Sequence, residues 1–400
     1  MTLHIFNPEN DLALACPSPH FIPPASARQM ADDLSALPVW WAMRGDAVCV
    51  ASVKEARRWA EEAGGICPEV RWVGRDGLPS DADVDPWGWS PLMVQRLLTG
   101  GADRSRLPDE ARLARYRELS NRRHAVDMLA YLCDPDLDLG QKWRDRLCGV
   151  SYYCTGEQEI IRRMRQYPET LLKAPWSGSG KGLRWCRRGL TKSTADWCRR
   201  ELVNHGALIL EPIYKKEGDF AMEFYSNGRG KVLFSGYSHF ITDEKGVYRG
   251  NMLVSNEEVE QWILRYIPLE AFVCIRGYLQ KVIEGIYGRY YSGPMGIDMM
   301  ICPDQRGYPY AIYPHVEINV RMTMGMVARQ LYDNFVAPGS KGIFNVDNFP
   351  SAEALRTQHE QDMRDYPLVV EEGRIVSGYL ALVPVTPQSR YRAYVRVEVC

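Results

Sequence analysis

The spacing of apolar and polar positions changes character along the chain. Over residues 1–115, short apolar runs alternate with amphipathic stretches, a pattern typical of an α/β unit. The run VKEARRWAEEA, closed by Gly64 and Gly65, predicts a helix. The expected strands of this unit are Leu3 to Phe6, Ala47 to Ala51 and Val70 to Val73. A Pro/Gly/Asp-rich passage and a charged helical region, LPDEARLARYRELSNRRHAVDMLAYL, then lead into the next unit.

From about residue 150 the pattern becomes α+β. TGEQEIIRRMRQY predicts a helix with Thr155 as its N-cap, and TADWCRRELVNHG predicts a second helix that ends at Gly206. One further helix is expected from Asn256 to Tyr287, and another in SAEALRTQHEQDMRDY. The remaining apolar runs predict strands: LLKAP, ALILEPI, DFAMEFY, KVLFSGYSHFIT, GIDMMIC, YAIYPHVEINV, IVSGYLALVPV and RYRAYVRVEV.

Composition narrows the possible functions. Lys plus Arg (49) balances Asp plus Glu (50), so no nucleic-acid partner is expected. The start lacks the features of a signal peptide, and no uncharged apolar stretch reaches the ~20 residues of a membrane span. The eleven cysteines contain no CxxC pair and the seven histidines no HExxH motif, which argues against a dedicated zinc site. We therefore expect a cytoplasmic protein that does not contact a membrane.

The stretch LLKAPWSGSGKGL (171–183) places small residues after an apolar run. It is not a Walker A motif, because Pro175 stands where the first glycine belongs and Gly182 follows Lys181 in place of Ser or Thr. It is not a dinucleotide fingerprint either, because its glycines are spaced GxGxG in mid-chain. Two interpretations remain open: a loop whose backbone N–H groups close over a triphosphate, or a plain β-hairpin turn.

Two downstream strands carry polar side chains in suggestive positions. In LILEPI, Glu211 interrupts an apolar strand before a proline, so the strand end either presents backbone groups to an adenine or is an edge facing water. In YPHVEINVRMTMG, Glu317, Asn319 and Arg321 alternate onto one face. Carboxylate and amide oxygens suit Mg²⁺, and a guanidinium suits phosphate. We therefore favour a site for Mg²⁺ and phosphate over a face that only contacts solvent. Asp298, in GIDMMIC, is placed to add a second carboxylate.

Taken in order, these features resemble the ATP-grasp superfamily. They are a strand-ending lysine, a glycine loop, a Glu-Pro strand, an Asp-bearing strand and an E-x-N-x-R strand. The resemblance covers residues 115–345 and implies ATP and Mg²⁺ as cofactors. For the nucleotide, it implies that Lys173 contacts the α-phosphate and adenine side and that Asp219 reaches the ribose. It also implies a lid over the β- and γ-phosphates and a hinge that reads adenine: Ser177, Gly178, Ser179, Gly180, Lys181 and Gly182 for the lid; Glu211, Pro212 and Ile213 for the hinge.

For the reacting groups, the resemblance implies that Mg²⁺ is bound by Asp298, Glu317 and Asn319. Arg321 would hold the transferred phosphoryl group or the substrate carboxylate. Lys181 is either a contact for the γ-phosphate or a solvated loop residue.

The sequence departs from the family pattern in two places. Where a lysine usually precedes the grasp unit, this chain has Arg122 and Arg123. The separation of Asp298 from Glu317 also requires a bulge near Pro314 if both are ligands.

The fold expected from the resemblance is α/β plus α+β, with a nucleotide clamped between two subdomains. The expected units are an N-terminal α/β substrate-side domain, a first grasp subdomain with the glycine loop, a second with the hinge and the Mg²⁺ site, and a C-terminal accessory segment: 1–115, 116–206, 207–348 and 349–400. The implied reaction is that of an ATP-dependent ligase joining a small-molecule carboxylate to an amine. A small-molecule kinase and a non-catalytic nucleotide-binding module are the alternatives.

Three further stretches are candidates for substrate contact. FNPENDLALA follows the first strand, where Asn7, Glu9, Asn10 and Asp11 either touch substrate or cap a helix through Asn10 or Asp11. DPWGWSP (85–91) places two tryptophans in a loop that is either a substrate wall or a plug between domains. YSHFITDEKGVYRGN contains His239 and Arg249, for which the surface of a hairpin is favoured over binding an anionic substrate.

Overall fold

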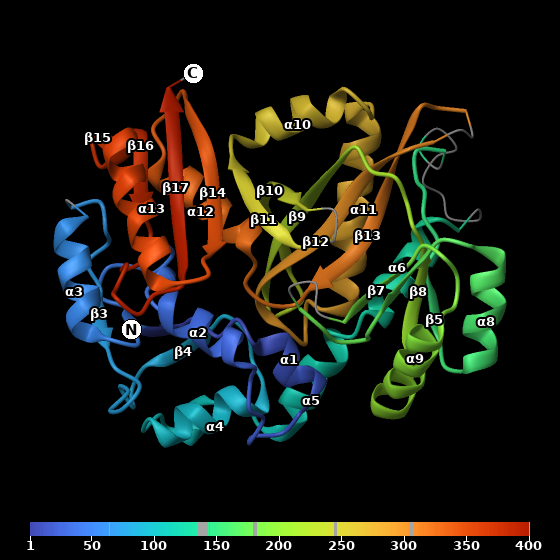
Figure 1. The fold of residues 1–400 in the computed structure, drawn as a ribbon, viewed down its shortest axis with the longest axis horizontal. Coiled ribbons are helices and arrows are strands. Elements are labelled where there is room, and N and C mark those ends of the chain that lie inside the picture. Colours follow the sequence, from blue (N-terminus) through green and yellow to red (C-terminus); the bar gives the residue numbers. More distant parts are fainter. Residues whose placement is uncertain are drawn as a thin grey trace.

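The computed structural model describes residues 1–63, 65–134, 143, 145–178, 182–243, 246–304 and 307–399. Strands in these ranges form one parallel sheet near the N-terminus and two antiparallel sheets, one large and one small (Figure 1). The predicted order, a small α/β unit followed by α+β units, is confirmed.

The N-terminal unit is a four-stranded parallel sheet in the order β3-β2-β1-β4. Two of its helices begin at polar caps that the sequence supplies: the Ser52 side chain accepts from the Glu55 N–H, and Ser90, which accepts from the Met93 N–H, precedes a proline at the first helical position. The elements are β1 (Thr2–Ile5), α1 (Asn10–Ala15), α2 (Ala25–Asp33), η1 (Leu37–Trp40), β2 (Ala47–Cys49), α3 (Val53–Glu62), β3 (Arg71–Val73), β4 (Asp83–Pro86), α4 (Pro91–Thr99) and η2 (Arg104–Arg106).

Two helices, α5 (Glu110–Leu119) and α6 (Arg123–Leu132), connect this unit to the small sheet, whose order is β5-β8-β6-β7. Its elements are β5 (Tyr152–Cys154), α8 (Glu157–Gln166), β6 (Thr170–Lys173), β7 (Leu183–Cys186), α9 (Lys192–His205) and β8 (Leu208–Pro212). The predicted Thr155 cap is wrong, because α8 takes Gly156 as its N-cap and has no side-chain cap. The predicted end of α9 at Gly206 is confirmed, since this glycine adopts a left-handed φ of 74°.

The large sheet has the order β13-β12-β9-β10-β11-β14-β17-β16-β15. Its elements are β9 (Gly218–Asn227), β10 (Val232–Thr242), β11 (Tyr248–Leu253), α10 (Asn256–Leu264), α11 (Leu269–Ile286), β12 (Ser292–Pro303), β13 (Tyr310–Asn319), α12 (Met324–Phe335), β14 (Ser340–Asn348), α13 (Ala352–Asp365), β15 (Val369–Glu371), β16 (Arg374–Ala381) and β17 (Tyr391–Val399). The single helix predicted from Asn256 to Tyr287 is wrong. It divides at Pro268, the N-cap of α11, because proline disfavours helical geometry at the preceding residue. Among the helices described, none has the length and apolar character needed to cross a bilayer.

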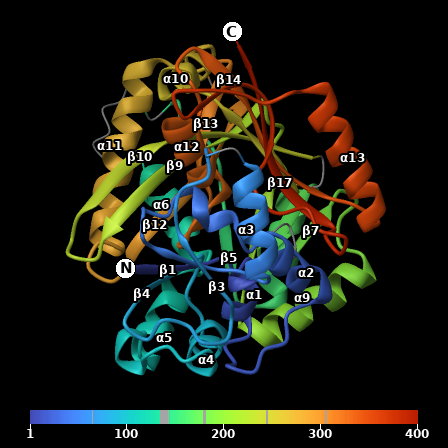
Figure 2. The same ribbon diagram turned by 90° about the vertical axis from the view of Figure 1, so that its left-hand side faces the viewer.

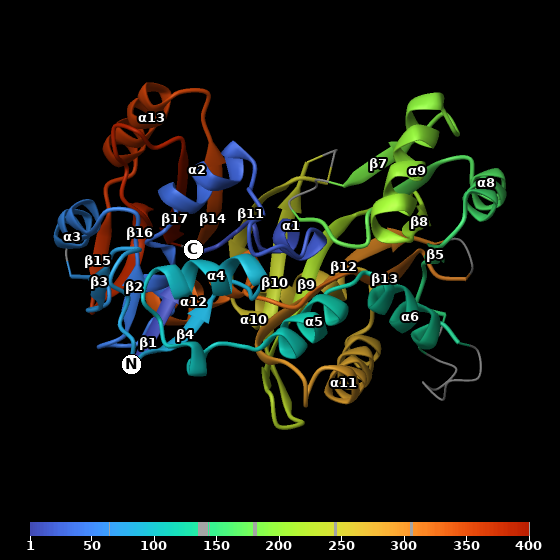
Figure 3. The ribbon, with the colours of Figure 1, turned by 90° about the horizontal axis from the view of Figure 1, so that it is seen from below.

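The alternation along β9 gives the large sheet two different faces. Phe220, Met222 and Phe224 are fully buried and belong to the core formed with α10 and α11, which lie beneath the sheet in Figure 3. Ala221 and Glu223, between them in sequence, point to the opposite face and line a cavity. The apolar face fixes the register of the strand, and the register in turn fixes which polar side chains enter the cavity.

The C-terminal strands extend the large sheet and contact the N-terminal unit. β14 pairs with β11 on one side and with β17 on the other, so residues beyond 349 are continuous with the large sheet. Two indole N–H groups of the N-terminal unit donate to carbonyls at the end of β16: Trp40 to Leu382 at 2.7 Å and Trp59 to Ala381 at 3.1 Å. Figure 2 shows β17 running behind α3. The boundaries of the four expected units remain predictions.

Candidate active site

The predicted metal ligands lie side by side on the cavity face of β12 and β13. Asp298 stands directly opposite Glu317, and the Asn319 amide donates to the Asp298 carboxylate at 3.3 Å. The register shifts after this pair, because Met300 faces Tyr313 and residues 314–316 all stand opposite a single residue of β12. The bulge predicted near Pro314 is therefore confirmed, and it brings the two carboxylates together.

This cluster has the chemistry of a hard-cation site. Burial, together with the neighbouring Glu317 carboxylate, raises the pKa of Asp298 to about 7 against the opposing charge of Arg321. Within the described ranges, no group of three or more His, Cys, Asp or Glu is placed to hold a metal, so the set consists of two carboxylates and one amide. Mg²⁺ commonly takes one or two protein carboxylates and completes its shell with phosphates and water, which these residues fit.

Arg321 connects this cluster to the N-terminal unit. Its guanidinium makes a forked ion pair with Asp11 of α1, at 2.9 Å from Nε and 2.7 Å from Nη2 to Oδ2, and it also donates to the Asn319 amide oxygen at 2.9 Å. Asp11 does not cap α1, whose N-cap is Glu9 without a side-chain bond. Capping by Asn10 or Asp11, the alternative considered for this turn, is wrong, and the turn reaches the candidate site through Asp11.

The other residues of that turn hold it against the next loop. The Asn7 amide donates to the Gly88 carbonyl at 2.9 Å, and Glu9, which is 2 % exposed, pairs with Arg96 of α4. Asn10 packs closely against Gly88, where an added Cβ would overlap its side chain. These contacts orient Asp11 and do not themselves reach the cavity lining.

Lys173 and Glu211 form a buried ion pair between β6 and β8. Their charged atoms are 2.8 Å apart, with side chains only 5 % and 7 % exposed, and Lys173 also donates to the Val316 carbonyl at 3.0 Å. Because β8 lies between β5 and β6, the alternative of a water-facing edge residue at Glu211 is wrong. The Ile213 N–H is already bonded to the Glu169 carbonyl, so Glu211, Pro212 and Ile213 as an adenine hinge remain a prediction.

The glycine loop joins two antiparallel strands, β6 and β7, and its ends are tightly packed. A Cβ at Gly178 would lie 2.8 Å from the Asp11 carboxylate, and Gly182 has a φ of +82°. The loop therefore starts against the N-terminal unit, beside the ion pair with Arg321. The predicted lid residues Ser179, Gly180 and Lys181 lie outside the described residues, so their roles remain predictions.

Arg122 lies between the glycine loop and β13, the strand that carries Glu317 and Asn319. One nitrogen, Nη1, donates to the Ala174 carbonyl and to the Ser177 hydroxyl at 2.7 Å, while Nη2 donates to the Ser177 carbonyl at 3.0 Å and pairs with Glu317. The guanidinium is 7 % exposed. Of the two arginines noted in the sequence, Arg122 is thus at the site, whereas Arg123 pairs with Asp127 on the helix surface.

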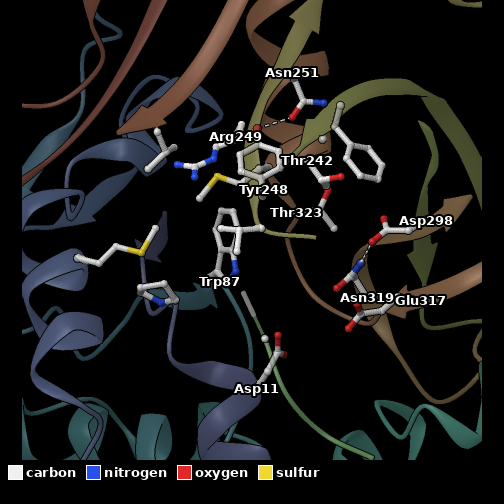
Figure 4. Close-up of a pocket in the computed structure, with 18 of the residues that line it drawn as sticks. Asp11, Trp87, Thr242, Tyr248, Arg249, Asn251, Asp298, Glu317, Asn319 and Thr323 are labelled. Carbon is white, nitrogen blue, oxygen red and sulfur yellow. Dashed lines mark hydrogen bonds between the residues drawn. The ribbon is translucent and has the colours of Figure 1, made fainter. Parts of the chain in front are cut away.

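A cavity of about 730 Å³ opens beside the metal cluster (Figure 4). Its walls come from α1, α2, the Trp87 loop, the large sheet and the segment after β14. The lining includes Asp11, Met30, Trp87, Gly178, Glu223, Ser238, Thr242, Tyr248, Arg249, Asn251, Asp298, Glu317, Asn319, Arg321, Thr323, Val346, Asp347, Phe349 and Tyr391. This volume is in the range of pockets that hold small organic molecules.

The lining of this cavity shows where several further candidates from the sequence lie. Trp87 lines the cavity and packs edge-on against Phe6, with ring centroids 5.0 Å apart. The tryptophan loop as a substrate wall or as a plug between domains remains a prediction. Arg249 lines the cavity while paired with Asp243 at 2.7 Å. His239 instead stacks on Trp262 at 4.1 Å. Asp219 accepts from Thr242 at 2.7 Å and pairs with Lys216, and it is not part of the lining.

Glu223 is a site residue that sequence reasoning missed. It is 1 % exposed and accepts a hydrogen bond from the Thr323 hydroxyl at 2.8 Å. Burial raises its pKa to about 8, and the nearby Asp298 carboxylate acts in the same direction. The signal was present in DFAMEFY, where alternation puts a carboxylate on the face opposite three large apolar residues.

No protein-family model matches the chain, and no curated protein matches it. Among solved structures, the biotin carboxylase β-γ-ATP complex from Campylobacter jejuni has a TM-score of 0.50 at 10% identity, covering 99% of this chain and 87% of that one. N5-carboxyaminoimidazole synthetase from Staphylococcus aureus, complexed with ADP, has a TM-score of 0.49 at 11% identity, with coverage of 100% and 93%. D-alanyl-alanine synthetase A from Vibrio cholerae has a TM-score of 0.42 at 13% identity, with coverage of 73% and 95%.

The likeness to the biotin carboxylase extends over nearly the whole chain and includes all three sheets. The sequence resemblance, drawn from the order of the motifs, and the observed architecture agree. The chain has the ATP-grasp fold.

Proposed function

We propose that the protein is an ATP- and Mg²⁺-dependent ligase that activates a carboxylate as an acyl phosphate for attack by an amine or similar nucleophile. The observation that carries the proposal is the row of Asp298, Glu317 and Asn319 beside Arg321, which lines a cavity large enough for an organic substrate. The solved biotin carboxylase of the same fold is a complex with a form of ATP, which supports a nucleotide as the second substrate.

Each residue has a role that follows from its charge and position. A carboxylate is unreactive toward amines because oxide is a poor leaving group, and bound ATP would supply the phosphoryl group that converts it into a good one. Asp298, Glu317 and Asn319 would hold Mg²⁺. Arg321, oriented by Asp11, would bind the anionic carboxylate or phosphoryl oxygens.

Lys173 and Arg122, which lie outside the lining of the cavity, would supply positive charge to the nucleotide. Lys173, fixed by Glu211 and the Val316 carbonyl, is positioned without flexibility, which is how a phosphate contact is best preorganised. Arg122 anchors the start of the glycine loop through Ser177 and so sets where the lid begins. Ser177, Gly178 and Gly182 would frame that lid over the phosphates.

A thermal-shift titration with ATP and MgCl₂ tests the nucleotide and metal sites. ATP at a hundred times its dissociation constant is expected to stabilise the fold by roughly 2.7 kcal/mol. Asp298→Asn keeps the shape of the ligand and removes its charge, so it is expected to lose the Mg²⁺-dependent part of the shift. Asp81→Asn, in an exposed turn, is the matched control. Absence of any Mg²⁺-dependent shift in the wild type would refute the proposal.

Phosphate release then distinguishes ligase from kinase. A ligase releases phosphate from ATP only when a carboxylate and a nucleophile are both present. A kinase leaves a phosphorylated acceptor and no free phosphate, so a stable phosphorylated product would replace the ligase assignment.

A further inference from the structure

The charges around the cavity leave one carboxylate without a cation. Apart from Glu223, each acidic side chain of the lining has a positive partner or belongs to the candidate metal set. Asp11 pairs with Arg321, Glu317 with Arg122 and Asp347 with Arg392, and Asp298 is a candidate metal ligand. Glu223 receives only the Thr323 hydroxyl, and it forms no ion pair with any residue that the structure describes. Because burying an unpaired carboxylate is costly, the empty site keeps a proton on Glu223. An amine that takes up this proton becomes an ammonium group and can pair with the carboxylate.

Glu223 is held rigidly in place. Thr323, the N-cap of α12, donates to one carboxylate oxygen, and Gly296 leaves space for the same oxygen, since a Cβ there would lie 2.7 Å from it. Gly325 is likewise in close contact with the other oxygen, which a Cβ at that position would overlap. A carboxylate fixed in this way is preorganised to bind a group of defined position.

Its position is next to the metal cluster. Glu223 pairs with Gly296 across β9 and β12, and Asp298 is two residues further along β12 on the same face. Diagonal neighbours of this kind are roughly 7–8 Å apart. A nitrogen held by Glu223 would therefore lie within reach of a carbonyl carbon held at the metal end.

Beyond Glu223, the cavity has apolar and aromatic surface from Met30, Trp87, Phe349 and Tyr391. Polar side chains, among them Ser238, Thr242 and Asn251, lie in the same lining. The two arginines of the lining differ in place. Arg321, bound to Asp11, lies beside the metal set, where the proposed function uses it, whereas Arg249 is paired with Asp243. Away from the metal end, the described part of the lining therefore holds no unpaired cation for a phosphate or a second carboxylate.

We propose that this cavity binds the nucleophile of the reaction, and that the nucleophile is an amine carried on a bulky aromatic or aliphatic body. The nitrogen is held by Glu223, and the body lies against Trp87, Phe349 and Tyr391. This inference rests on the proposed ligase function and names the class of its amine substrate.

The test uses 2-phenylethylamine as the probe and measures its affinity for the full chain by calorimetry. Ethylamine has the same head group without the ring, and 3-phenylpropionate has the same ring with an anionic head. Both are expected to bind at least about tenfold more weakly than 2-phenylethylamine. Equal or tighter binding of 3-phenylpropionate would overturn the inference.

Variants locate the bound amine. Glu223→Gln and Phe349→Ala are each expected to weaken 2-phenylethylamine by about tenfold, while Glu61→Gln, on the exposed surface of α3, leaves its affinity unchanged. Unchanged affinity in both Glu223→Gln and Phe349→Ala would overturn the proposed location. If Glu223→Gln does not fold, unchanged affinity in Phe349→Ala alone would overturn it.

Repeating the titrations with ATP and MgCl₂ separates this inference from the proposed function. Binding of nucleotide without any binding of 2-phenylethylamine would refute the amine site alone. Binding of 2-phenylethylamine without any nucleotide binding would support the amine site and refute the ligase.

Discussion

Replacing Glu223 with glutamine is expected to change how the stability of the protein depends on pH. The pKa of this carboxyl rises from 4.5 to about 8 on folding, because burial penalises its charged form. Between these two values the folded protein holds a proton that the unfolded chain releases. The free energy of unfolding therefore falls as the pH rises through this window.

The magnitude follows from the size of the shift. Each pH unit between the unfolded and folded pKa values changes the stability by about 1.4 kcal/mol. From pH 5 to pH 8 the wild type is thus expected to lose up to roughly 4 kcal/mol that Glu223→Gln retains. Glutamine keeps the shape of a protonated glutamate and can still bond to the Thr323 hydroxyl, so the folded structure is preserved.

Urea unfolding of both proteins at pH 5, 6, 7 and 8, in buffer with a chelator, measures this difference. Asp298, whose pKa burial raises to about 7, and His315, whose pKa burial lowers to about 3, titrate in both proteins and largely cancel in the comparison. Parallel stability curves for the wild type and Glu223→Gln across this range would refute the reasoning. A wild type that gains stability relative to Glu223→Gln as the pH rises would have the wrong sign and would refute it equally.

Two further substitutions test the packing of the site. Lys173→Met leaves Glu211 buried without its cation and is expected to lower the free energy of unfolding in urea by about 3–5 kcal/mol. Adding Glu211→Leu is expected to recover much of this loss. A double variant as unstable as the single one would contradict this. Gly325→Ala drives a Cβ into Glu223 and is expected to cost about 1–3 kcal/mol in thermal unfolding, while Gly277→Ala, in open space on α11, is neutral or stabilising. Equal effects at the two glycines would show that Gly325 is not sterically constrained.

The polar face of β13 was predictable because the local order of residues specifies it. Alternation places Glu317 and Asn319 on one face of β13, and the count of residues between Asp298 and Glu317 demands a bulge. Arg321 lies two residues beyond the end of this strand. The division of the long helix at Pro268 was also readable from the sequence, since a proline marks a boundary, but apolar periodicity on both sides concealed it.

The partners of these residues could not be predicted, because they depend on contacts between distant segments. Arg321 meets Asp11, which lies 310 positions earlier in the chain, and no local pattern specifies that pairing. The cavity wall at Phe349 and Tyr391 exists because β14 and β17 join the large sheet, a choice made by long-range strand pairing. Arg122 likewise reaches the site through the packing of α6 against the glycine loop.

The contact between the first and last parts of the chain has a consequence for biosynthesis. Trp40 donates to a carbonyl 342 positions later, so a nascent N-terminal unit leaves the ribosome long before its partner strands exist. Until then Trp40 and Trp59, which are nearly fully buried in the finished protein, lack the cover that β16 and its neighbours provide. Domains usually fold in order of synthesis, but here the surface that is synthesised first is covered only by strands that are synthesised last.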